Sequence, residues 1–331
     1  MPSTRLTAAV AMTVAYMAGS TVLGNPLIAD QQPSADQEET FVFFIPDPPI
    51  DEQLAYIFDT ERNHLLISSN RVGELPRGLP RNRDADEWIV LPGNIRAYRT
   101  PSFNSSPSDI ELSFPQAVQS VGTGPVTAEG SDWVAFEYND TIFYLPVPLL
   151  ARRAVDKISG NYPIGKEPVS RDHPIPEDYR PSDLLKLDQT WNFHGPDYPK
   201  LLRAEAARVI EEMLTFARRQ GVNIRVFSAY RSYARQRYLY LKKIRQEGLT
   251  QLLVAKPGHS EHQLGTAVDL CSPDPASVAS ADFGSSREGA WLREHSTKFG
   301  FIQSYREDNR RESGYLPEPW HYRYTGKRPP P

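Results

Sequence analysis

The chain has 331 residues, of which 39% are hydrophobic and 24% are charged, as is typical of a globular protein large enough for two modest domains. Its formal net charge of −4 is spread over segments of mixed sign, so we expect no nucleic-acid partner. The single cysteine, Cys271, excludes an intramolecular disulfide, and stability must therefore come from the core or from a bound metal.

The first 24 residues have the layout of a secretory signal. Arg5 precedes an apolar stretch at 6–23, and small residues up to Gly24 lead into a polar spacer. A charged end, a short apolar core and a small-residue zone are typical of signal peptides. We therefore expect residues 1–24 to direct export to the periplasm or cell envelope. The alternative is an uncleaved segment that anchors the protein in the membrane.

The next segments predict a small all-β domain between two connections. Residues 25–87 are interpreted as a spacer and an unassigned segment. Residues 88–150 contain short runs rich in Val, Ile, Tyr, Phe and Trp, with a hairpin-type turn at Asn139-Asp140. This barrel-like stretch resembles bacterial SH3-like domains, which bind cell-wall peptides or act as spacers. The proline-rich residues 151–173 are interpreted as a linker.

From residue 174 to residue 326 helical and extended patterns alternate, which predicts a compact α+β domain. Apolar residues at helical spacing follow "YPK" and end at Gly221, and a second helix is expected over 233–247, closed by Gly248. Strands are expected at "NIRVF", "TAVDL", "FIQSY" and "PWHYRY". The last five residues, 327–331, are interpreted as a tail.

The segment "GHSEHQLGTAVDL" predicts a metal site. His262 and Asp269 flank Gly265, which allows a sharp turn so that both side chains can converge. Neutral imidazole and carboxylate are ligands that zinc prefers. An unpaired carboxylate within the apolar strand would be costly, and a bound cation removes that cost. The alternative is an aspartate that backbone donors satisfy.

The segment "LPEPWHYRY" supplies a possible third ligand, His321, and a glutamate, Glu318, three residues before it. A glutamate beside zinc can act as general base. Pro317 and Pro319 exclude a regular helix, so a bend must bring the carboxylate toward the metal. The alternative is an edge strand with a surface histidine.

The segment "FSAYRSYARQ" places Arg231 where a strand runs into the N-terminus of a helix. An arginine there can hold a substrate carboxylate bidentately or stabilise a developing oxyanion. The alternative is an arginine in a surface salt bridge.

Together these motifs resemble the VanY-type D-alanyl-D-alanine carboxypeptidases, within the group of zinc peptidases that includes lysostaphin-like enzymes and the hedgehog signalling domain. The resemblance covers about 174–326 and includes "S-x-Y-R-S", "S-x-H-x-x-G-x-A-x-D" and "E-P-W-H-Y-R-Y". It implies an α+β fold with a small central antiparallel sheet flanked by helices.

The resemblance also implies the site residues. One zinc ion would be held by His262, Asp269 and His321. Catalytic roles fall to Glu318, as general base, and to Arg231. Substrate contacts would come from Arg231, Ser232, Gln236 and Ser260. His259 has no counterpart among the ligands and is expected to line the cleft or to face solvent.

The implied function is that of an exported, monomeric D,D-carboxypeptidase that removes a terminal D-alanine from peptidoglycan stem peptides. The same zinc scaffold could instead serve an L,D-carboxypeptidase or a peptidoglycan endopeptidase. A third hypothesis is a non-catalytic cell-wall-binding protein, in which residues 88–150 are the functional part. The sequence contains no "G-x-S-x-G" segment, which argues against a Ser-His-Asp hydrolase.

Overall fold

The computed structural model describes residues 86–122, 124–155, 158–194 and 199–327. All of them belong to one compact unit that spans residues 43–331. The predicted signal peptide and almost all of the predicted spacer lie outside the described residues. In the described part of the chain, no helix combines the length and the apolar character that a membrane span requires.

Residues 87–152 form two antiparallel sheets, so the predicted all-β character is confirmed. The three-stranded sheet has the order β4-β1-β8 and consists of β1 (Glu87–Val90), β4 (Ala117–Gln119) and β8 (Leu150–Arg152). The five-stranded sheet has the order β3-β2-β7-β6-β5 and consists of β2 (Ile95–Tyr98), β3 (Pro107–Leu112), β5 (Val126–Ala128), β6 (Ser131–Tyr138) and β7 (Thr141–Pro146). Its likeness to SH3 domains stays a prediction.

The β6–β7 hairpin shows why this part of the sequence is extended. Asn139 and Asp140 both have positive φ, at 50° and 58°, which suits the tight turn that joins twisted strands. The turn aligns Tyr138 with Thr141, and the register places the buried Val134 opposite the buried Leu145. The hairpin turn predicted from Asn139-Asp140 is therefore present.

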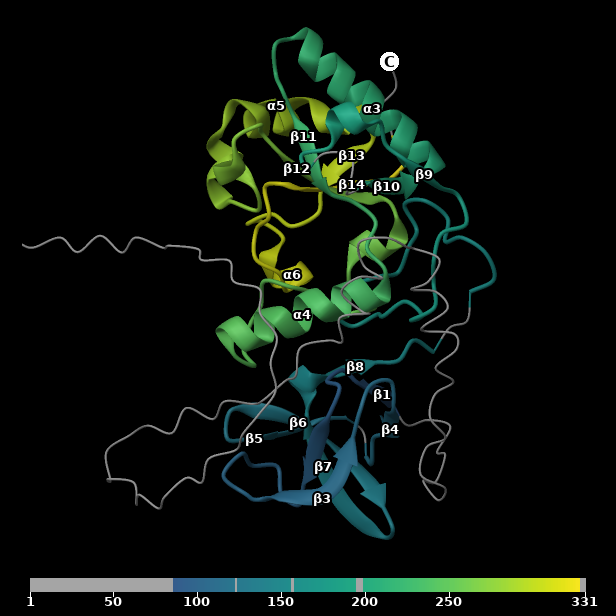
Figure 1. Ribbon diagram of the computed structural model, residues 1–331, viewed down its shortest axis with the longest axis vertical. Coiled ribbons are helices and arrows are strands. Elements are labelled where there is room, and N and C mark those ends of the chain that lie inside the picture. The colour runs from purple at the N-terminus through teal and green to yellow at the C-terminus, as the bar shows by residue number, and fades with distance from the viewer. Residues whose placement is uncertain (1–85, 123, 156–157, 195–198, 328–331) are drawn as a thin grey trace, which may run out of the picture. The chain divides into compact units, whose positions relative to one another are not determined.

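The α+β region is built on a four-stranded antiparallel sheet with the order β11-β12-β14-β13 (Figure 1). Its strands are β11 (Arg225–Ser228), β12 (Ala267–Cys271), β13 (Phe301–Gln303) and β14 (His321–Tyr324). The helices are α3 (Ala204–Arg219), α4 (Tyr233–Glu247), α5 (Arg287–His295) and the short α6 (Arg310–Ser313). Short 3-10 helices include η2 (Gln189–Trp191), η3 (Glu261–Leu264), η5 (Ala281–Ser285) and η6 (Ser296–Phe299).

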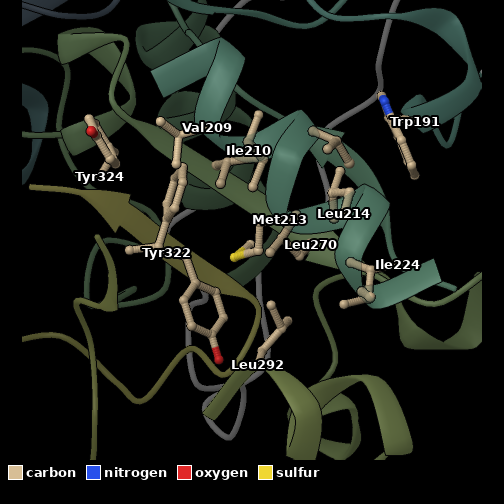
Figure 2. Packing of buried hydrophobic residues seen from close by; sticks show 14 of the residues in the cluster. Trp191, Val209, Ile210, Met213, Leu214, Ile224, Leu270, Leu292, Tyr322 and Tyr324 are labelled. Atoms are coloured by element: carbon tan, nitrogen blue, oxygen red, sulfur yellow. The ribbon is translucent and has the colours of Figure 1, made fainter. Parts of the chain in front are cut away.

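Helix α3 forms the core with this sheet. Val209, Ile210 and Met213 recur at helical spacing on one face and are buried, as the sequence predicts. Figure 2 shows this face directed at Leu270 of β12 and Tyr322 of β14, which belong to the same hydrophobic cluster. Each such fully buried side chain contributes roughly 1.5–3 kcal/mol. The core thus fixes β12 and β14, the two strands that carry candidate ligands.

Two expectations about this region need correction. The helical pattern was expected from Leu202, but residues Leu201–Arg203 form β10, which pairs antiparallel with β9 (Leu184–Lys186). Pairing with β9 provides hydrogen-bond partners for the backbone N–H and C=O groups of Leu201–Arg203, so this segment is extended and the helix begins after it. The predicted linker also packs: Tyr162 and Val169 are buried in a cluster with Leu264 of η3.

Helix α4 joins the two parts of the described chain. Its Tyr240, Leu241 and Ile244 belong to the buried cluster formed by the β strands of residues 87–152, including Val90 and Phe136. Its N-terminus follows β11, and the Ser232 side chain caps it by accepting a hydrogen bond from the backbone of Arg235. The helix start at residue 233 and its end at Gly248 match the prediction.

The glycine between the two ligands of the first motif has a steric role that can be measured. Gly265 has φ +71°, and an added Cβ would lie 3.0 Å from Leu184 Cδ2 and 3.1 Å from Arg203 Cγ. We expect Gly265→Ala to lower the free energy of unfolding by about 3 kcal/mol, from left-handed strain and overpacking together. Urea denaturation measures this loss.

The matched control is Gly130→Ala, because Gly130 has a similar φ of +74° and open space around the added Cβ. It should cost about 1 kcal/mol, the strain alone. Equal losses in the two variants would contradict a role for the contacts at Leu184 and Arg203.

Candidate metal centre

The structure brings the three predicted ligands together. Asp269 on β12 lies directly opposite His321 on β14, so both side chains project from the same face of the sheet. His262 lies on η3, whose C-cap is Gly265 in the left-handed conformation. Candidate ligand atoms of the three residues lie within 4.8 Å of one another, and all three side chains are buried.

Hydrogen bonds orient the rings of the cluster. His262 places Nδ1 2.6 Å from the carbonyl oxygen of Ala229, so Nδ1 donates and Nε2 is the free nitrogen. That Nε2 lies 3.1 Å from Asp269 Oδ2. His321 Nδ1 lies 2.9 Å from the other carboxylate oxygen, Asp269 Oδ1. One carboxylate thus lies between two imidazole nitrogens, and the three groups are close enough to share one cation.

The charges suit a cation. Burial, together with the charge of Arg231, lowers the pKa of His262 to about 4, so this imidazole is neutral. Burial alone would raise the pKa of Asp269, but the two imidazoles hold it below its usual value. Burial alone would lower the pKa of His321, yet hydrogen bonds to Asp269 and Glu261 raise it to about 10. A metal ion would take the place of the proton on His321 Nδ1.

Glu318 lies beside the cluster on the expected bend. The His321 backbone N–H donates to the Glu318 carbonyl at 3.1 Å, which closes a turn between the residues, and Glu318 N–H donates to the carbonyl of Tyr305. The turn brings Glu318 Oε2 to 3.9 Å from His321 Nδ1. Burial raises the pKa of Glu318 to about 7, with Asp269 adding to the increase. A carboxylate with a pKa near 7 is suited to accept and return a proton at neutral pH.

Arg231 approaches the same carboxylate from the end of β11. Its Nη2 lies 3.9 Å from Asp269 Oδ2, and its backbone N–H donates to the carbonyl of His262. Among described residues, the buried Nε of Arg231 has no hydrogen-bond partner. The guanidinium therefore retains a donor for a carboxylate or an oxyanion.

A cleft of about 850 Å³ is lined by all the predicted metal ligands, catalytic residues and substrate-binding residues. Its lining includes Arg231, Ser232, Gln236, Ser260, His262, Asp269, Glu318 and His321. Gln236 is buried, donates through Nε2 to the carbonyl of Ala255 at 2.7 Å, and leaves Oε1 without a hydrogen bond in the described part of the chain. Ser260 caps η3 through its side chain.

One expectation about this region is wrong. His259 was expected to line the cleft or to face solvent, but it is 5% exposed and its Nδ1 lies 2.9 Å from the carbonyl oxygen of Ser170. Ser170 belongs to the predicted linker. The packing of that segment therefore buries His259 away from the cleft.

Sequence reasoning missed Glu261 and Tyr305. Glu261 is buried beside His321, and the hydrogen bond from His321 and the charge of Arg323 outweigh the effect of burial and lower its pKa to about 2. The ring of Tyr305 is stacked on that of His321, with centroids 4.9 Å apart. The position of Glu261 next to His262 was visible in the sequence, but nothing in the spacing separates it from a surface carboxylate. Tyr305 gave no signal.

Fold and geometry define an α+β protein with a candidate metal site of two histidines and one aspartate in a cleft. Residues 199–327 match the family described as VanY, D-alanyl-D-alanine carboxypeptidase. VanXYC of Enterococcus gallinarum, a bifunctional D-Ala-D-Ala dipeptidase and D-Ala-D-Ala carboxypeptidase, is 30% identical over 164 residues, which are 48% of this chain and 82% of that protein. The chain belongs to the VanY family.

Other relatives are similar over the same part of the chain. YodJ of Bacillus subtilis is 34% identical over 162 residues, and the D-alanyl-D-alanine carboxypeptidase of Enterococcus faecalis is 32% identical over 169 residues. Each match covers 48% of this chain. The chain spans 59% of the length of YodJ and 57% of the length of the Enterococcus faecalis protein. The solved LdcB LD-carboxypeptidase is 33% identical with a TM-score of 0.44, covering 47% of this chain and 74% of that chain. The D,D-pentapeptidase VanY of a VanB-type cassette, in complex with Zn(II), is 30% identical with a TM-score of 0.39, covering 48% and 86%.

Loss of one imidazole should weaken the metal site. We expect His262→Ala to lower the affinity for a divalent metal by more than about 100-fold, because even outer partners of ligands are worth about 10–100-fold. Metal content after dialysis, measured by mass spectrometry, tests this. The control is His295→Ala, since His295 stacks on Trp291 at 4.6 Å and does not line the cleft. Equal metal content in both variants would contradict the assignment.

Proposed function

We propose that this protein is a zinc-dependent D,D-carboxypeptidase that removes a terminal D-alanine from peptidoglycan stem peptides. The observation that carries the proposal is the cluster of His262, Asp269 and His321 in a cleft, with the Glu318 carboxylate beside it. Family membership and the relatives named D-alanyl-D-alanine carboxypeptidases support the substrate class.

The residues fit one zinc ion. Two imidazoles and one carboxylate are a donor set of catalytic zinc sites, which keep one further position for water or substrate. The buried Nε2 of His262, which makes no hydrogen bond in the described part of the chain, is the atom that such an ion would satisfy. Zinc supplies an acidified water and polarises a carbonyl group when it is bound.

The residues of the chain then divide the remaining tasks. Glu318, which lines the cleft, accepts the proton of the attacking water and returns it to the leaving amine of D-alanine. Arg231 binds the terminal carboxylate of the peptide or stabilises the developing oxyanion. Gln236 accepts a peptide N–H through its unpaired Oε1, and Ser232 and Ser260 contribute further contacts from the lining of the cleft.

The proposed substrate lies outside the cytoplasmic membrane, which agrees with the export expected from residues 1–24. We therefore place the protein in the periplasm or the cell envelope. A protein held at the membrane by an uncleaved N-terminal segment would carry out the same reaction on the same substrate. The protein acts as a monomer in this proposal.

Product masses test the proposed reaction. Zinc-loaded protein is incubated with a muropeptide that ends in D-alanyl-D-alanine, with one that ends in a single D-alanine after an L-centre, and with a cross-linked dimer. We expect loss of one alanine from the first substrate, and no loss in the presence of a chelator. Loss from the second would favour an L,D-carboxypeptidase, and cleavage of the dimer an endopeptidase. No product from any substrate would contradict the proposal and leave the wall-binding hypothesis.

The role of Glu318 is tested by Glu318→Gln, which keeps the shape but cannot accept a proton. We expect kcat to fall by about 10²–10⁴-fold, the range for loss of a general base, with zinc still bound. The control is Glu312→Gln, since Glu312 is exposed on α6 and does not line the cleft. Turnover at the wild-type rate in Glu318→Gln would refute the role.

A further inference from the structure

A row of buried charged side chains leads away from the metal cluster through the second histidine. His321 Nε2 lies 2.9 Å from Glu261 Oε2. Arg323 Nη1 donates to Glu261 Oε1 at 2.8 Å, and Arg323 Nη2 donates to Glu167 Oε2 at 2.7 Å. All four side chains are 12% exposed or less.

The arrangement follows from the strand geometry. His321 and Arg323 are two residues apart on β14, so their side chains project from the same face. Glu261 on η3 lies between them and bonds to both. Ser304 adds a third hydrogen bond, from Oγ to Glu261 Oε2 at 2.6 Å. Both oxygens of this buried carboxylate are therefore used, and its position is fixed.

The two histidines of the metal cluster are oriented through different ring nitrogens. His262 donates through Nδ1 to the Ala229 carbonyl, which directs Nε2 at Asp269. His321 has its Nε2 at Glu261, which directs Nδ1 at Asp269. His321 thus faces a carboxylate through each nitrogen, and a metal ion bound at Asp269 would take the place of the Nδ1 proton only. The Glu261 carboxylate then retains the proton on Nε2.

Glu261 differs from Glu318 in its surroundings. Glu318 lines the cleft, whereas Glu261 is not among the residues that line it and lies on the opposite side of the His321 ring. A carboxylate in that position can reach a bound peptide only through the histidine. Arg323 is in turn paired with Glu167, so the charge of the guanidinium is shared between two carboxylates.

We propose that Glu261 is a positioning residue that keeps His321 protonated on Nε2 and turned with Nδ1 toward the metal, and that Arg323 and Glu167 hold Glu261 in place. This inference rests on the proposed zinc centre. It assigns a function to the residue between Ser260 and His262, and it links the metal site to Glu167, which lies within the predicted linker.

Zinc affinity of the full chain, measured by competition with a chromophoric chelator, tests the proposal without a substrate. We expect Glu261→Gln to weaken zinc binding about 10–100-fold, and saturating zinc to restore most of kcat. The control is Glu205→Gln, which removes the charge of a carboxylate that accepts a hydrogen bond from the Tyr324 hydroxyl at 2.7 Å, outside the metal cluster. Wild-type zinc affinity in Glu261→Gln would overturn the proposal.

A second measurement needs no variant and so does not depend on the folding of Glu261→Gln. In the zinc-loaded wild-type protein with ¹⁵N-labelled histidine, NMR reports which ring nitrogen carries the proton. We expect the proton on Nδ1 of His262 and on Nε2 of His321. A proton on Nδ1 of His321 would overturn the proposal. Both readouts are independent of peptide hydrolysis, so an inactive protein that passes them would refute the proposed function and leave the role of Glu261 intact.

Discussion

The site depends on one strand pairing. β12 and β14 run antiparallel with Asp269 directly opposite His321, and this register decides that a carboxylate and an imidazole share one face of the sheet. A slip of one residue would turn one of the two side chains to the opposite face. The core beneath the sheet, where Leu270 and Tyr322 pack against α3, stabilises that register. Packing of apolar residues thus determines the positions of polar ones.

The second constraint is the cost of burying charge. Asp269, His321 and Glu261 are all nearly inaccessible to water, and each is stable there because a partner of opposite charge or a hydrogen bond compensates it. Removing a single partner would leave a buried charge without compensation. This explains why the polar residues form a continuous network. A metal cation suits the place where His262 Nε2, Asp269 and His321 Nδ1 come together.

Sequence reasoning went further for the site than for the surrounding packing. The resemblance to the VanY-type enzymes implied the ligands His262, Asp269 and His321 and the base Glu318. Residue type and proline placement alone left a structural aspartate and a surface histidine open as alternatives. The burial of His259 and the strand at Leu201–Arg203 were not predicted, since both depend on segments far away in sequence. The carbonyl of Ser170 accepts a hydrogen bond from His259, and β9 pairs with Leu201–Arg203.

The sequence by itself determined the donor types, the helices α3 and α4 with their glycine ends, and the extended character of residues 88–150. These features depend on neighbours within a few positions, which the sequence displays directly. Only the tertiary structure decided which nitrogen of each histidine faces Asp269, and that Glu261, rather than a solvent-exposed carboxylate, holds His321. Those choices are made by hydrogen bonds across 33 residues for His262 and 60 residues for His321, which local sequence patterns do not encode.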